Sequence, residues 1–108
     1  MTRRAAHIDD NQPAIVTALV EAGCTVQSLA GVGCGCPDLL VGFKGVNVLL
    51  EVKNLEGLDG KVKRGAGITP DQLKWHRWYT GQVAVVHGPQ EALDVVAAEY
   101  LRLSPAAK

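Results

Sequence analysis

The chain has 108 residues, of which 47% are hydrophobic and 20% are charged, and its formal net charge is zero. This length supports one compact domain around one core, here residues 1–108, and is too short for two. A neutral chain is not expected to coat nucleic acid through bulk electrostatics. Local basic surfaces remain available at several positions: Arg3, Arg4, Lys61, Lys63, Arg64, Lys74 and Arg77.

The lack of an expected targeting segment and the cysteine usage both favour a cytoplasmic location. No apolar run reaches the roughly 20 residues that a membrane span needs, and no apolar stretch follows the N-terminal arginines to form a signal peptide. The sequence has three cysteines, Cys24, Cys34 and Cys36, and an odd number cannot form a complete disulfide framework. A cytosolic setting would keep these thiols reduced. The Cys34-x-Cys36 spacing is shorter than that of common zinc sites, and we expect Cys24 in the core.

A first helix is predicted to begin within residues 9–13, where proline is tolerated in the first turn. Its apolar stripe consists of Ile15, Val16, Leu19 and Val20, and Gly23 is the expected stop. Two roles are open for the polar residues at its start. Asp9, Asp10 and Asn11 either cap the helix and complement its dipole, or contribute to a site.

Residues 24–29 alternate weakly and predict a first strand. A loop of small residues, 30–36, follows, and it lacks the Lys and Ser of a phosphate-binding P-loop. Its glycines either let the backbone approach a ligand, or simply turn the chain.

Residues 37–54 are the most apolar stretch and predict a β-hairpin with a two-residue turn at Lys44 and Gly45. In this register Phe43 faces Val46, and Asp38 lies directly opposite Glu51. Alternation places a purely apolar set on one face: Leu39, Val41, Phe43, Val46, Val48, Leu50 and Val52. The other face carries acids and a lysine at one end.

The opposed carboxylates of Asp38 and Glu51 need an explanation, because facing residues have Cβ atoms about 5 Å apart and like charges at that spacing are destabilising. A divalent cation between them would remove the repulsion, and carboxylate oxygens are ligands that Mg²⁺ prefers. The Lys53 side chain is predicted to lie on the same face of the hairpin as these two carboxylates. The alternative is that Asp38 begins a strand after Pro37, while Glu51 pairs with Lys53 at a solvated sheet edge.

Residues 55–67 are rich in glycine and charge, and predict a flexible loop beside this site. Lys61, Lys63 and Arg64 in this loop either grip phosphates or belong to a solvated linker.

The next helix is predicted to start at residues 69–72 with a capping box between Thr69 and Gln72. Leu73 and three aromatic residues supply its apolar bulk, and we expect burial against the sheet rather than base stacking for Trp75, Trp78 and Tyr79. His76 is either an ordinary surface histidine, or a proton shuttle or phosphate contact.

The last strand is predicted over residues 82–87, parallel to the strand over residues 46–53, because a helix connects the two. A final helix starts at residues 88–91 and directs five residues inward: Leu93, Val96, Ala97, Tyr100 and Leu101. Both termini are expected to be frayed. The predicted order is therefore α-β-β-β-α-β-α, an α/β fold around a mixed sheet.

Three segments together resemble a known family. Pro-Asp at 37–38, followed after a short hairpin by Glu-Val-Lys at 51–53, is similar to the PD-(D/E)xK nuclease signature. Ile-Thr-Pro-Asp-Gln at 68–72 resembles the Leu-Thr-Pro-x-Gln segment of small stand-alone VRR-NUC-like members, which are phage-type and similar to Holliday-junction resolvases. The resemblance covers roughly residues 9–93.

The resemblance implies a restriction-endonuclease-like core with a C-terminal helix, and a Mg²⁺-dependent DNA endonuclease that also accepts Mn²⁺. The implied substrate is branched, flap or nicked DNA, and the implied assembly is a homodimer. If a phage encodes the chain, the implied location is the host cytoplasm. The implied metal ligands are Asp38, Glu51 and the Val52 carbonyl; the implied catalytic residues are Asp38, Glu51, Lys53 and Gln72. Asp10 or Asn11 is a further candidate, and the candidate DNA contacts are Lys61, Lys63, Arg64, Lys74 and Arg77.

Two interpretations from other classes remain open. In one, the domain binds DNA without cutting it or serves as an interaction module on the same fold, which the intact Asp, Glu and Lys disfavour. In the other, the hairpin charges form an edge-strand salt bridge in a small scaffold.

Overall fold

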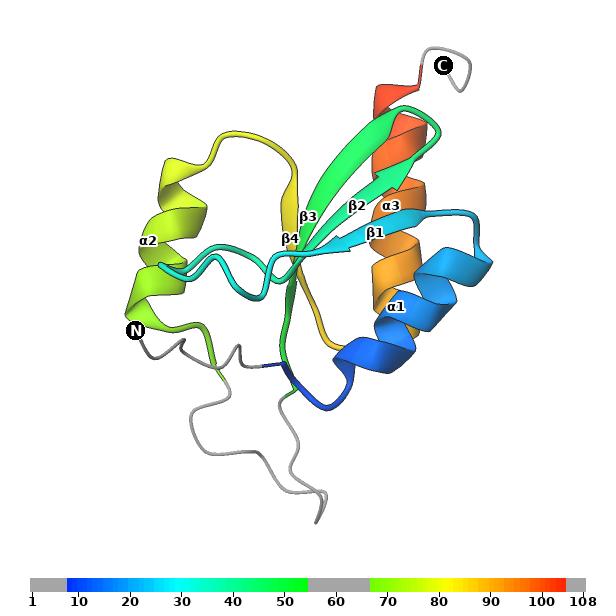
Figure 1. Cartoon of the computed structure of the whole chain (residues 1–108). Coiled ribbons are helices and arrows are strands. Elements are labelled where there is room, and N and C mark those ends of the chain that lie inside the picture. The colour runs from blue at the N-terminus through cyan, green and yellow to red at the C-terminus, as the bar shows by residue number, and fades with distance from the viewer. Residues whose placement is uncertain (1–7, 55–66, 105–108) are drawn as a thin grey trace.

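The computed structural model describes residues 8–54 and 67–104. Its elements are α1 (Gln12–Glu21), β1 (Thr25–Ser28), β2 (Leu39–Phe43), β3 (Val46–Val52), α2 (Pro70–Trp78), β4 (Val83–Val86) and α3 (Pro89–Leu103), in the predicted order (Figure 1). Residues 55–66 of the predicted loop, with Lys61, Lys63 and Arg64, lie outside the described residues, as do 1–7 and 105–108.

The described strands form a four-stranded mixed sheet in the order β1-β2-β3-β4. β1 and β3 both pair with β2 in antiparallel fashion, and β4 pairs with β3 in parallel, as predicted. The predicted hairpin register is confirmed, since Phe43 pairs with Val46 and Leu39 with Leu50. The turn residues Lys44 and Gly45 both have positive φ angles, 46° and 85°, which two-residue hairpin turns require for their twist to match the strands.

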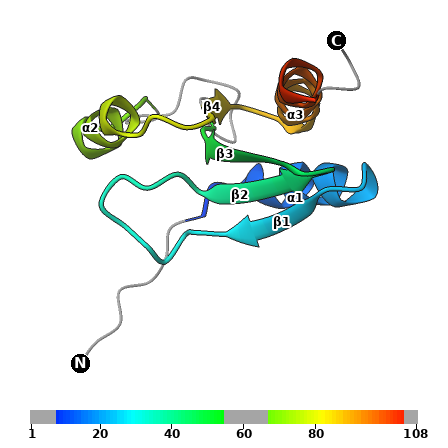
Figure 2. The same ribbon diagram turned by 90° about the horizontal axis from the view of Figure 1, so that it is seen from above.

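Helices lie on both sides of the sheet, with α1 and α3 on one side and α2 on the other (Figure 2). α1 packs against α3 and β1, and α3 also packs against β3 and β4. Most of the predicted apolar hairpin face is buried in the core, whereas Phe43 and Val46 are half-buried. The core residues are Ile15, Leu19, Cys24, Leu39, Val41, Val48, Leu50, Val52, Val86, Ala92 and Val96, which confirms the prediction for Cys24. Within the described ranges, none of the helices combines the length and apolarity that crossing a bilayer requires.

The start of α1 is fixed by long-range contacts. Asn11 occupies the N-cap position but makes no side-chain cap bond. Its Nδ2 instead donates to the Lys53 carbonyl at 3.1 Å and to the His87 carbonyl at 2.8 Å. Asn11 therefore ties the first helix to the ends of the two parallel strands, which corrects the capping interpretation for this residue.

Three predicted buried positions on the outer helices are wrong. Val20 on α1 is 55% exposed, Leu101 on α3 is 60% exposed, and Ala97 on α3 is exposed as well. Each helix buries only the side that faces its neighbours, so apolar residues at the margin of the predicted stripe face solvent.

α2 departs most from expectation. None of its residues is fully buried, and Leu73 is 45% exposed. The predicted burial of Trp78 is wrong, because this residue is 71% exposed, whereas Trp75 and Tyr79 are half-buried. The helix rests on the loop before β2. Gly35 has a φ of 81°, and a Cβ there would collide with the backbone of Asp71 and Gln72. The loop glycine thus allows a close approach to the first turn of α2.

Candidate active site

The pairing of β2 with β3 brings the two acids together. Asp38 immediately precedes β2, and it stands opposite Glu51 one position beyond the Leu39–Leu50 pair. The Asp38 N–H donates to the Leu50 carbonyl at 3.1 Å, so the ladder extends to this residue. A hydrogen bond joins the side chains of Asp38 and Glu51. The two carboxyl groups therefore converge on the same spot, as the predicted register requires.

Asp38 also has a structural partner that the sequence did not reveal. Its Oδ2 accepts the Val52 N–H at 2.7 Å, at the point where β2 offers no further backbone partner to β3. The N–H and C=O of one strand residue point toward the same edge. The Val52 carbonyl therefore points toward the side occupied by Asp38, where the resemblance implied a third ligand.

Glu51 is a buried acid with only 1% of its surface exposed. The pKa of Glu51 is raised to about 9, first by burial and then by the hydrogen bond to Asp38 and the negative charge of Asp38, against a lowering effect of the Lys53 charge. Two acids this close cannot both ionise without a compensating charge. In the absence of a cation, the pair therefore holds one proton at neutral pH.

Lys53 and Gln72 meet beside the carboxyl pair. Lys53 Nζ donates to Gln72 Oε1 at 2.6 Å. The same oxygen accepts the Thr69 N–H at 3.0 Å, while Thr69 Oγ1 accepts the Gln72 N–H at 3.2 Å, which confirms the predicted capping box. Gln72 therefore caps α2 and holds the lysine at the same time.

His76 and Cys36 also line the site; a site role had been left open for His76 and not considered for Cys36. His76 Nε2 lies 3.8 Å from Glu51 Oε1, and among the described residues neither buried atom has a hydrogen-bond partner. Burial lowers the pKa of His76, and so does the Lys53 charge. The interpretation of His76 as a satisfied surface histidine is wrong. Its spacing of four residues from Gln72 was an available signal, because such residues share a helix face.

The pKa of Cys36 identifies it as another neighbour of the acids. Burial raises this pKa, and the negative charges of Glu51 and Asp38 raise it further. The thiol therefore lies close enough to the carboxyl groups to feel their charge, although its odd spacing from Cys34 suggested no role.

The polar residues before α1 differ in their distance from the acids. Asp10 is exposed, whereas the charge of Asp9 reaches Glu51 and helps to raise its pKa. Gln12 is only 4% exposed, and its Oε1 is buried without a hydrogen-bond partner among the described residues. Of the α1 candidates, Asn11 is the one that contacts the Lys53 backbone.

The donor set fits a hard cation. The described residues contain no group of three or more His, Cys, Asp or Glu side chains that could hold a metal ion, so a cation here would rely on the two acids and a backbone carbonyl. Two carboxylates and one carbonyl suit Mg²⁺, which keeps several positions for water and phosphate oxygens. The buried and unpartnered Glu51 Oε1, as seen among the described residues, is the oxygen that such a cation would satisfy.

Comparisons with protein-family models, with curated proteins and with solved structures each found no match to this chain. Function must therefore be inferred from the site itself.

Proposed function

We propose that this protein is a Mg²⁺-dependent DNA endonuclease with a restriction-endonuclease-like fold, which hydrolyses phosphodiester bonds. The supporting observation is that the Asp38 and Glu51 carboxyl groups meet in a buried position, beside a lysine held by Gln72. A solvated salt bridge at a sheet edge does not account for this arrangement, because Glu51 is almost completely buried. Burying two adjacent acids, which must share a proton or bind a cation, lowers stability, and such costs are concentrated at functional sites.

Asp38, Glu51 and the Val52 carbonyl would hold the cation. When bound, Mg²⁺ lowers the pKa of a coordinated water and neutralises the negative charge that develops on the phosphate. The carboxyl pair must lose its proton before it can ligate a cation, so we expect cation binding to strengthen as the pH rises through the neutral range.

Lys53 would position the attacking water and stabilise the developing charge. One of its three N–H groups is directed at Gln72 Oε1, which leaves two for water and a phosphate oxygen. Gln72 therefore acts as a positioning residue for Lys53.

A titration of Mg²⁺ or Mn²⁺ with linear, flap, nicked and four-way DNA tests the proposal. Lys53→Ala should reduce the cleavage rate by about 10³-fold or more, since the members of such a site act as a unit. Lys44→Ala is the matched control, because Lys44 lies in the turn at the opposite end of the same hairpin. DNA binding without cleavage in any metal would favour a non-catalytic DNA-binding module instead.

The homodimer implied by the resemblance remains a prediction. Sedimentation of the purified chain, with and without DNA, would test it.

A further inference from the structure

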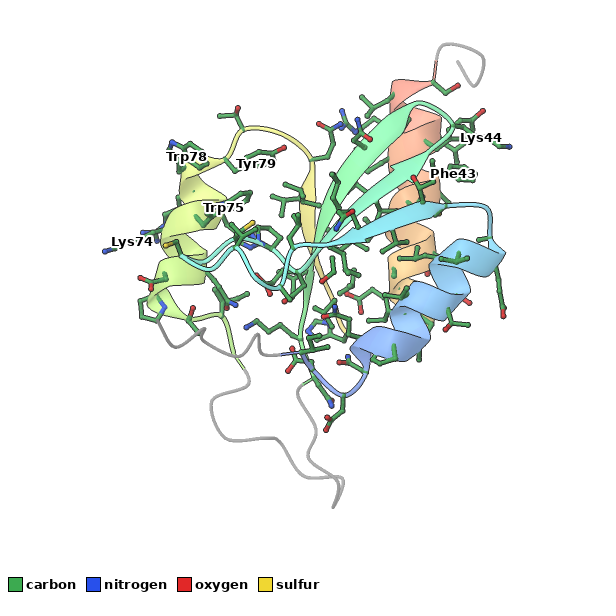
Figure 3. All side chains as sticks on the ribbon, in the orientation of Figure 1. Phe43, Lys44, Lys74, Trp75, Trp78 and Tyr79 are labelled. Carbon is green, nitrogen blue, oxygen red and sulfur yellow. The ribbon has the colours of Figure 1, made fainter. Side chains whose placement is uncertain are left out.

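A groove lies between α2 and the loop before β2, next to the candidate active site. It has a volume of about 360 Å³ and is lined by Cys34, Asp71, Lys74, Trp75 and Trp78. The four helical residues follow the i, i+3, i+4, i+7 pattern, so they share one face of α2. Figure 3 shows Trp75 and Trp78 along α2, with Lys74 projecting from its outer side.

The two tryptophans of the groove are held differently. The Trp75 ring stacks on Tyr79, with centroids 4.6 Å apart and an interplanar angle of 22°. It also meets Trp78 edge-on at 5.9 Å. Trp78 itself remains 71% exposed. A large aromatic ring that lines a groove beside a cationic side chain is the combination that binds bases by stacking.

We propose that this groove binds an unpaired nucleobase adjacent to the scissile phosphate, so that the preferred substrate contains a single-stranded region. This inference rests on the proposed function. A base within a duplex has both faces covered by its neighbours, whereas a base outside the stack offers a free face to Trp78.

The residues that line the groove are sequence neighbours of residues at the candidate active site. Cys34 lines the groove, while Cys36, two residues later, feels the charges of Asp38 and Glu51. On the helix, Trp75 of the groove lies next to His76 of the site, with ring centroids 6.0 Å apart. A strand whose phosphate lies at the carboxyl pair would therefore bring a neighbouring base to the groove.

The charges around the groove also fit a nucleotide. The Asp71 carboxylate disfavours a phosphate at its own end of the groove, so that end suits a neutral base. Lys74 lines the groove, and Arg77 is exposed on the same helix. These two cations can contact the phosphates on either side of the bound base.

Tryptophan fluorescence is a specific probe of this groove, because Trp75 and Trp78 are the only tryptophans in the sequence. The full chain in EDTA, which prevents cleavage, would be titrated with a single-stranded oligonucleotide of about ten nucleotides, which spans one protein site. An abasic strand of equal length and a blunt duplex are the comparison ligands. We expect quenching by the base-containing strand and little quenching by the other two.

The variants test whether Trp78 supplies the stacking surface. Trp78→Ala should weaken binding of the single strand by about 5- to 150-fold, as measured by anisotropy of a labelled oligonucleotide, whereas Trp78→Phe should retain most of the affinity. Leu101→Ala is the matched control, because Leu101 is another exposed apolar residue, on α3. Far-UV circular dichroism would verify that each variant is folded.

Equal affinity for abasic and base-containing strands, or unchanged binding by Trp78→Ala, would overturn the proposal. A fluorescence change that depends on protein concentration without DNA would also overturn it, since the groove would then be a contact between two copies. If the single strand quenches the tryptophans but no metal supports cleavage, the groove assignment stands and the nuclease proposal fails. If blunt and single-stranded substrates are cut equally and Trp78→Ala has no effect, the nuclease proposal stands and the groove assignment fails.

Discussion

Replacing Glu51 by glutamine tests the electrostatics of the buried acid pair, because glutamine has nearly the same shape but no charge. In the metal-free fold the pKa of Glu51 is raised from its ordinary 4.5 to about 9 by burial and by Asp38. Between these values the folded chain keeps a proton that the unfolded chain has released. The associated stability is complete below the ordinary pKa and is lost as the pH rises toward the folded pKa.

The size of the effect follows from one retained proton. Each pH unit within this window lowers the free energy of unfolding by about 1.4 kcal/mol. His76 acts in the opposite direction, because its pKa is lowered from 6.5. Its contribution to the free energy of unfolding is therefore complete above pH 6.5 and is lost as the pH falls. A window from about pH 7 to about pH 8.5 therefore isolates Glu51, and wild type should lose about 2 kcal/mol across it.

Urea titrations in EDTA at several pH values, followed by circular dichroism, would measure this slope. Glu51→Gln should show almost none of it, because the titrating group is gone. Saturating Mg²⁺ should reduce the wild-type slope, since a cation favours the deprotonated pair. If wild type and Glu51→Gln lost the same stability with rising pH, the inference of a proton on the buried pair would be refuted.

Three further predictions concern the contacts around the pair. In EDTA, Asp38→Ala should lower the free energy of unfolding by about 1–3 kcal/mol, because the Val52 N–H loses its acceptor. Asp38→Asn should lose less, because its amide oxygen can still accept this hydrogen bond. Equal losses for the two variants in urea titrations would contradict this prediction. Mg²⁺ at about 100 times its Kd should stabilise wild type by about 2.7 kcal/mol and raise its Tm, but barely move Asp38→Asn; the same thermal shift in both would argue against a cation at this pair. Asn11→Ala should cost about 1–3 kcal/mol in a urea titration, because the carbonyls of Lys53 and His87 lose their donor; an unchanged midpoint would show that this amide does not anchor α1.

The hairpin shows how much could be predicted from sequence. Its alternating apolar residues and the Lys44–Gly45 turn determine the register, because a slip of one residue would turn the whole apolar face to solvent. Once the register is set, the opposition of Asp38 and Glu51 follows without further information. The capping box at Thr69 and Gln72 was predictable for a similar reason, since it depends only on local hydrogen bonds.

Contacts between distant segments could not be predicted in this way. The sequence suggested a cap at Asn11, but the folded chain uses its amide to join α1 to β3 and β4. It suggested a buried aromatic face on α2, but that helix rests on Gly35 and leaves Trp78 exposed.

The sequence by itself therefore determined the elements, their order and the pairing that opposes the two acids, because these depend on local patterns and on hydrophobic alternation. Only the tertiary structure decided that His76 and Cys36 join the site and that Gln72 holds Lys53. The physical reason is that these contacts join segments far apart in the sequence, as does the close approach of Gly35 to the backbone of Asp71 and Gln72, and the sequence carries no periodic signal for them.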